Sequence, residues 1–124
     1  MFGLRALQET QEHTHSFYAA SVNTITAYPS LTGDQRADVV VVGGGFSGVN
    51  TALELAERGF DVALVEANRI GWGATGRNGG QVIGGIGHTP ERFKKAIGEA
   101  GIRDIYQMGI EARDVIRERV ERYN

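Results

Sequence analysis

One stretch, DVVVVGGGFSGVN at residues 38–50, decides the fold. Its four consecutive valines, preceded by a charge and followed by glycine, predict a strand of a parallel sheet that is buried on both faces. The residues after the glycines alternate between apolar and polar with the period of a helix, and Gly59 stands where a terminating glycine would end it. The apolar side of this helix comprises Val49, Ala52, Leu53 and Ala56.

A second apolar run, Val62–Val65, follows the helix and ends at Glu66. Strand, glycine turn, helix and strand in this order form a βαβ unit with a right-handed crossover. We therefore expect the α/β class, with the βαβ start of a Rossmann-like domain followed by amphipathic helices. Two strands are too few for a doubly wound sheet, whose two faces must both be covered, so we expect the domain to be incomplete.

Gly43, Gly45 and Gly48 have the spacing of a dinucleotide-binding turn. The first permits the tight turn out of the strand, the second lets the backbone approach a pyrophosphate, and the third lets the helix pack against the sheet. The helix N-terminus then offers free N–H groups to the phosphates. Glu66 follows Gly48 by 18 residues, close to the spacing of about 20 for an acid that binds the cofactor ribose and repels a 2′-phosphate. The alternative is a glycine-rich turn with a solvated glutamate.

The segment RIGWGATGRNGGQ at residues 69–81 stands where simple NAD-binding domains usually continue into another helix. Its small residues leave room for a flat ligand and expose backbone N–H groups. A flexible surface loop is the alternative, but such a loop has little reason to contain Ile70 and Trp72. The segment therefore argues against a simple NAD-binding module.

The composition excludes several classes of protein. Glycine occurs 18 times in 124 residues, and 13 of these glycines lie between Gly43 and Gly87, which indicates backbone that bends sharply or approaches a ligand. A net charge of −2 and a sequence pI of about 5.9 disfavour a nucleic-acid binder. The chain has no cysteine, which excludes disulfides, a thiol nucleophile and any cysteine-ligated zinc or iron–sulfur site.

The remaining sequence signals favour a cytoplasmic protein without a metal. Met1–His15 carries charges and lacks the apolar core of a secretory signal. The uncharged run Val39–Thr51 is shorter than the roughly 20 residues of a membrane span. His13 and His15 lack a third ligand, so no metal site is expected. His88 is expected to be a loop residue, with proton transfer as its alternative role.

Three segments are expected along the chain: an arm at 1–37, the nucleotide-binding unit with its loop at 38–88, and a helical segment at 89–124. Within the arm, Leu4–Glu12 is a candidate helix.

In the last segment, Thr89-Pro90-Glu91 combines an N-cap, a first-turn proline and an early acid, which predicts a helix from Pro90 to Glu99. Gly101 is expected to break it, and a longer amphipathic helix follows. This helix still continues at Asn124, so we expect the segment to be truncated there. Its charges predict a solvated face rather than a binding patch; they are Arg113, Asp114, Arg117, Glu118, Glu121 and Arg122.

Residues 39–81 resemble the FAD-binding N-terminus of the D-amino-acid-oxidase-like FAD-dependent oxidoreductases. Within that family, the loop Arg69–Gln81 is most similar to the gamma-glutamylputrescine oxidase group. The segments Ser16–Ser21 and Ile116–Tyr123 also resemble that group, so the resemblance spans most of the chain.

The resemblance implies FAD as cofactor and assigns roles to the matching positions. Glu66 would bind the adenosine ribose, and Arg69 would lie near the adenosine or the phosphates. Some relatives tether flavin through a histidine in this loop; here those places hold Arg77 and Asn78, so non-covalent FAD is expected. Arg77 is the candidate for tuning the flavin electronically, with a phosphate or surface contact as its alternative. The implied FAD-binding set is Gly43, Gly45, Phe46, Ser47, Gly48, Glu66, Ala67, Arg69, Gly73, Ala74, Thr75, Asn78, Gly79, Gly80 and Gln81.

The resemblance further implies a flavin-dependent amine oxidoreductase. A C–N bond would be oxidised to an imine, with hydride transfer to flavin N5 and reoxidation by molecular oxygen. The substrate would be a small amine such as gamma-glutamylputrescine, in polyamine catabolism. Its contacts would lie beyond Asn124, and the 124-residue chain alone is expected to be inactive. The alternatives are another FAD-dependent amino-acid oxidase or dehydrogenase of the superfamily, and a non-catalytic nucleotide-binding fragment.

Overall fold

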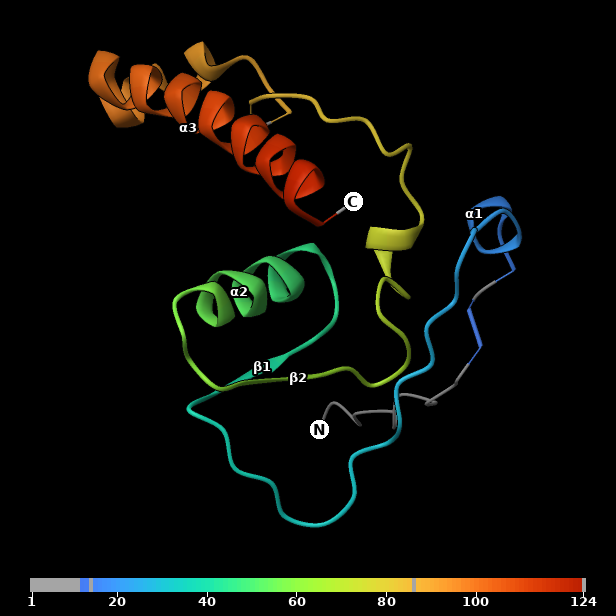
Figure 1. Cartoon of the computed structure of the whole chain (residues 1–124). Coiled ribbons are helices and arrows are strands. Elements are labelled where there is room, and N and C mark those ends of the chain that lie inside the picture. Colours follow the sequence, from blue (N-terminus) through green and yellow to red (C-terminus); the bar gives the residue numbers. More distant parts are fainter. Residues whose placement is uncertain (1–11, 14, 86, 124) are drawn as a thin grey trace, which may run out of the picture. The chain divides into compact units, whose positions relative to one another are not determined.

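The structure is a computed structural model that describes residues 12, 13, 15–85 and 87–123 (Figure 1). Contacts divide the chain into two compact units, Met1–Gly79 and Gly80–Asn124. The candidate helix at Leu4–Glu12 lies outside the described residues except for its last position. The described elements are α1 (Phe17–Ala20), β1 (Val39–Val42), α2 (Phe46–Glu57), β2 (Val62–Val65), the 3-10 turns η1 (Ala74–Gly76) and η2 (Pro90–Phe93), and α3 (Lys94–Tyr123).

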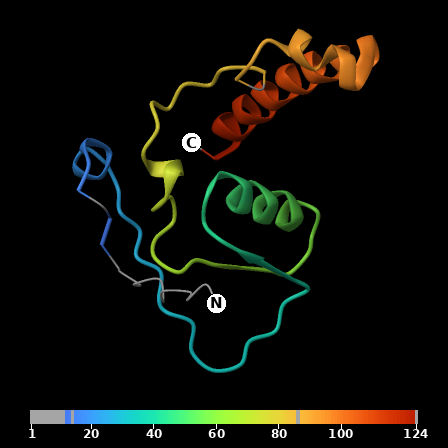
Figure 2. The ribbon, with the colours of Figure 1, turned by 180° about the vertical axis from the view of Figure 1, so that it is seen from behind.

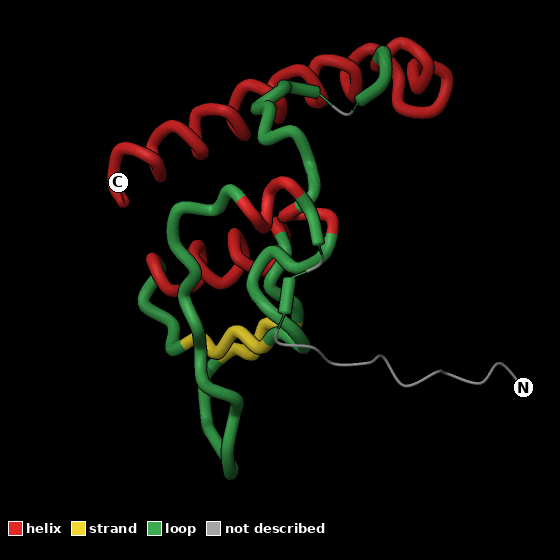
Figure 3. The backbone as a smooth tube through the Cα atoms, turned by 90° about the vertical axis from the view of Figure 1, so that its right-hand side faces the viewer, coloured by secondary structure: helices red, strands yellow, loops and turns green. Residues whose placement is uncertain are grey.

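The first unit contains the βαβ arrangement that the sequence predicts. β1 and β2 pair in parallel, with Val39 opposite Val62 and Val42 opposite Val65, and they form the yellow pair of Figure 3. α2 connects them and lies along one face of the pair, as the view from behind also shows (Figure 2). The strand–helix–strand order and the parallel pairing of the α/β prediction are thus confirmed.

The expectation that the first strand is buried on both faces is wrong for the described chain. Val39 and Val41 are half-buried, whereas Val40 is 58% exposed and Val42 is 82% exposed. Side chains alternate between the faces of a strand, so a single helix can cover only every second valine. α2 covers the face to which Val41 belongs.

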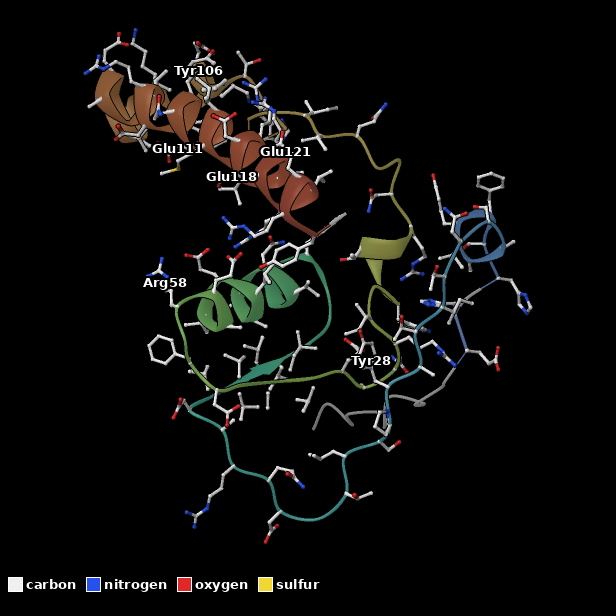
Figure 4. The ribbon with its side chains drawn as sticks, viewed as in Figure 1. Tyr28, Arg58, Tyr106, Glu111, Glu118 and Glu121 are labelled. Carbon is white, nitrogen blue, oxygen red and sulfur yellow. The ribbon has the colours of Figure 1, made fainter. Side chains whose placement is uncertain are left out.

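Local sequence sets both ends of α2. Gly45 is the N-cap with extended backbone, and Phe46 is the first helical residue. At the other end, Gly59 takes a φ of +89° and turns the chain into β2, as predicted for a terminating glycine. Arg58, labelled in Figure 4, forms an exposed i,i+4 ion pair of 2.6 Å with Glu54. Such a pair contributes only a few tenths of a kcal/mol.

The helical part of the second unit begins with a 3-10 turn, whereas the sequence predicted a helix from Pro90. Pro90–Phe93 is a 3-10 turn, and α3 then runs from Lys94 to Tyr123. The predicted break at Gly101 is wrong, because the non-helical residue is Gly98, with φ 66° and ψ −176°. Gly101 instead stays helical beneath Ile97: a Cβ at Gly101 would lie 2.7 Å from the Cβ of Ile97.

A tyrosine links η2 to α3. The hydroxyl of Tyr106 donates a hydrogen bond of 3.2 Å to Oε1 of Glu91 (Figure 4). The negative charge of Glu91, together with this hydrogen bond, raises the pKa of Tyr106 above its ordinary value of 10.0. The neutral phenol is therefore the form that the folded unit prefers.

This link predicts a pH dependence at high pH. The stabilisation from the pair is fully present below pH 10 and is lost as the pH rises through the raised pKa of Tyr106. We expect Glu91→Gln to return the pKa of Tyr106 towards 10.0, because the charge that opposes tyrosinate formation is removed. Tyrosinate absorbance measured during a pH titration, with Tyr106→Phe to identify the signal, checks this. A Tyr106 titration that Glu91→Gln leaves unchanged would contradict it.

Candidate functional site

The glycine turn lies at the carboxyl ends of both strands. The N–H of Gly43 donates a 2.7 Å hydrogen bond to the carbonyl of Val65, which extends the pairing by one residue beyond β1. Gly43 takes a φ of +104°, a conformation that residues with a side chain adopt only under strain. The chain therefore leaves the sheet abruptly between β1 and α2.

Gly48 brings α2 directly against this turn. A Cβ at Gly48 would overlap the carbonyl oxygen of Gly43 and lie 3.5 Å from Cγ1 of Val41. The overlapped atom belongs to the backbone, so a rotamer change of a neighbour cannot relieve the clash. The close helix–turn contact thus requires glycine here.

The N-terminus of α2 has the features of an anion-binding cradle. The N-cap, Gly45, has no side chain to accept a hydrogen bond, and the first turn contains no acidic residue. The N–H of Phe46 donates to Oγ1 of Thr75 at 3.0 Å. The N–H groups of Ser47 and Gly48 have no acceptor inside the helix, as in the first turn of any helix. Their donors and the helix dipole therefore favour a negatively charged group.

Glu66 connects the end of β2 to the glycine turn. Its Oε2 accepts a 2.5 Å hydrogen bond from the N–H of Gly44, and its Oε1 accepts one of 3.0 Å from the N–H of Asn68. The side chain is half-buried. Each carboxylate oxygen can accept more than one hydrogen bond, so the group can hold the turn and still accept from ribose hydroxyls.

Gly44 is a site residue that the sequence analysis missed. It is buried, its carbonyl accepts a 2.8 Å hydrogen bond from the N–H of Gly71, and a Cβ there would lie 2.5 Å from Cδ1 of Ile70. It therefore joins the two glycine-rich segments. The available signal was the run of three glycines, since the spacing motif explains only the first and the third.

The loop after Glu66 is held mainly by its own side chains. Nε of Arg77 donates to the carbonyl of Gly73 at 3.0 Å, and the guanidinium lies 5.5 Å from the ring centroid of Trp72. Nδ2 of Asn78 donates to the carbonyls of Ala74 and Thr75 at 3.3 and 2.6 Å. The loop thus presents backbone and small side chains next to the cradle.

A cavity of about 340 Å³ lies between the N-terminal arm and this loop. Arg69, Trp72 and Arg77 line it from the loop, and Tyr18 and Tyr28 line it from the arm. The indole N–H of Trp72 also donates to the carbonyl of Glu12 at 2.9 Å. The arm and the loop are therefore joined within the first unit.

The structure gathers part of the predicted site. Gly48 contacts Gly43, Thr75 contacts Gly45 and Phe46, and Glu66 reaches the turn through Gly44. Gly80 and Gln81 belong to the second unit. Among residues 12, 13, 15–85 and 87–123, no three His, Asp or Glu side chains form a candidate metal site. No helix in that part of the chain is long and apolar enough to cross a membrane.

These features fit a dinucleotide. The uncapped helix start supplies donors for a diphosphate. A Cβ at Gly45 would lie 3.2 Å from Oγ1 of Thr75, so glycine at this position lets the loop approach the helix start closely. An acceptor carboxylate stands one strand away, at Glu66.

Comparisons with known proteins agree with this geometry. The family model described as FAD dependent oxidoreductase (DAO) matches residues 38–124. The chain is 46% identical over 112 residues to gamma-glutamylputrescine oxidoreductase of Escherichia coli, covering 90% of this chain and 26% of that protein. It is 43% identical over 114 residues to the probable oxidoreductase OrdL of Haemophilus influenzae, covering 92% and 26%. The chain thus spans about a quarter of these relatives. No solved structure matches it.

Proposed function

Because the chain belongs to the FAD-dependent oxidoreductase family, whose members bind FAD, we propose that it forms the FAD-binding part of an amine oxidoreductase. The observation that carries this proposal is the uncapped N-terminus of α2 facing the glycine turn, with Glu66 bound to the same turn. The similarity to a protein named gamma-glutamylputrescine oxidoreductase supports an amine of that kind as substrate.

In this proposal the first unit binds the pyrophosphate and the adenosine ribose of FAD. The N–H groups of Ser47 and Gly48 bind the pyrophosphate, because they point away from the helix without an acceptor. Glu66 accepts hydrogen bonds from the adenosine ribose, with Ala67 beside it and Arg69 near the adenosine or the phosphates. The remaining contacts in the first unit come from the loop residues Gly73, Ala74, Thr75, Asn78 and Gly79.

The bound flavin would supply the redox chemistry, taking a hydride from the carbon of the substrate's C–N bond and passing the electrons to oxygen. The residues of this chain position that group. Neither cysteine nor histidine occurs between residues 69 and 81, which supports non-covalent binding. Thr75 orders the loop against the helix start through its hydrogen bond from Phe46.

The proposal is tested on the purified full-length protein. We expect oxidised-flavin absorption, release of the flavin on denaturation, and peroxide production with gamma-glutamylputrescine. A panel of D- and L-amino acids separates this activity from the second candidate, an amino-acid oxidase or dehydrogenase of the same family. A colourless protein that binds NAD saturably would refute the proposal.

Arg77 provides a prediction about flavin electronics. Its guanidinium is held in place by Trp72 and the carbonyl of Gly73, and a cation near the ring stabilises the reduced, anionic flavin. We expect Arg77→Gln to lower the two-electron midpoint potential by about 30 mV, the equivalent of about 1.4 kcal/mol. Arg77→Lys retains the charge and should keep most of the potential. Redox titration measures both; weaker FAD binding at an unchanged potential would instead indicate a phosphate contact.

A further inference from the structure

The second unit contains a cleft that is lined by none of the residues assigned to FAD. It has a volume of about 930 Å³, within the usual range of small-molecule sites. One wall is the segment Ile83–Pro90 with η2, apart from the undescribed position 86, and the other is α3. The residues of α3 that line the cleft lie three or four positions apart, which places them on one face of the helix. They are Tyr106, Gly109, Ile110 and Arg113.

The charged side chains that line this cleft are two arginines. Arg92 comes from η2 and Arg113 from α3. The imidazole of His88, from the preceding loop, also lines the cleft. Among the described residues, no carboxylate lines the cleft, and neither arginine has an ion-pair partner. The nearby carboxylate of Glu91 instead accepts the hydroxyl of Tyr106.

The position of Arg113 is set by close backbone contacts. A Cβ at Gly109 would lie 2.8 Å from the N of Gly85, so the loop rests directly on the backbone of α3. A Cβ at Gly84 would lie 3.4 Å from Nε of Arg113. The stem of Arg113 therefore lies against the loop, beside the cleft. Two other basic residues of α3 do form ion pairs: Arg117 pairs with Asp114, and Lys94 pairs with Glu99.

We propose that this cleft binds the carboxylate of a small aliphatic molecule. The guanidinium group presents paired donors that match a carboxylate, and two unpaired arginines from different elements converge on one cleft. Ile83, Pro90 and Ile110 supply an apolar surface for the aliphatic body. The sequence pattern placed Arg113 among the charges of a solvated helix face. In this proposal Arg113 instead binds a ligand.

The test is a ligand-observed NMR titration of glutarate with the purified full-length protein. We expect saturable binding that Arg92→Gln and Arg113→Gln each weaken about 10-fold or more, the loss of a hydrogen-bonded charge pair. Arg103→Gln is the matched control, because Arg103 is an exposed arginine of α3 outside the cleft. Its affinity for glutarate should equal that of the unaltered protein.

Three results would overturn the proposal: no saturable glutarate binding, an equal loss in Arg103→Gln, or displacement of glutarate by inorganic phosphate at lower concentration. If a glutamine variant fails to fold, Arg92→Lys and Arg113→Lys keep the charge and remove only the paired donors. They should still weaken binding, and unchanged affinity in both would count against the site. Flavin absorption, recorded in parallel, reports the FAD site separately, so failure of one inference does not imply failure of the other.

Discussion

Replacing Gly48 with alanine is expected to weaken FAD binding strongly. The added Cβ would overlap the backbone carbonyl of Gly43, and no side-chain movement relieves that overlap. α2 must then move away from the turn, which separates the N–H groups of Ser47 and Gly48 from the diphosphate. Overpacking of this kind costs about 1–3 kcal/mol or more. We expect FAD affinity to fall about 100-fold, equivalent to roughly 2.7 kcal/mol.

The measurement is the flavin-to-protein ratio after purification, followed by FAD titration of the deflavinated protein. Thr51→Ala is the control, because Thr51 is an exposed residue of the same helix and its loss removes no contact with the turn. Circular dichroism of both variants checks that they keep their helices. A Gly48→Ala protein that binds FAD as tightly as the unaltered protein would show that α2 does not need this close approach.

Removing the carboxylate of Glu66 is expected to cause the second large loss of FAD affinity. Glu66→Ala leaves the N–H groups of Gly44 and Asn68 without their acceptor, and an unsatisfied buried donor costs about 1–3 kcal/mol. It also removes the proposed acceptor for the ribose hydroxyls. We expect FAD affinity to fall about 100-fold or more. Glu66→Gln retains one acceptor oxygen and should lose about 10-fold.

Two ligands separate the two roles of Glu66. FMN lacks the adenosine portion, so its binding depends on the turn and not on the ribose contact. We expect Glu66→Ala to weaken FAD binding more than FMN binding, measured by quenching of flavin fluorescence. Equal losses would assign Glu66 to the turn alone. Glu54→Gln is the control, since that carboxylate on α2 pairs with Arg58 on the surface of the helix and its loss should leave flavin binding unchanged.

Much of the βαβ unit follows from local sequence. The two apolar runs are short, β-branched and bounded by glycine or charge, and the structure places β1 at Val39–Val42 and β2 at Val62–Val65. The helical pattern between them needs no distant partner to be recognised. Such patterns are readable because side-chain periodicity is a property of the local backbone.

The glycines show where local reasoning ends. Gly98, and not Gly101, takes the left-handed conformation in the last segment. Both residues permit it, and in the folded unit Gly101 stays helical with the side chain of Ile97 packed against it. The spacing motif leaves the position of Gly44 open to any residue, yet Gly44 is buried and joins the two glycine-rich segments. Its role arises from a contact with Gly71, 27 positions away.

The sequence by itself determined the class of the fold, the positions of both strands, the glycine turn and the acid that follows β2. These depend on short-range periodicity, spacing and backbone freedom. Only the tertiary structure decided that Glu66 binds the turn, that Thr75 meets the start of α2, and that Arg92 and Arg113 share a cleft. The physical reason is that each of these contacts joins residues on different elements, and their meeting depends on how the elements pack.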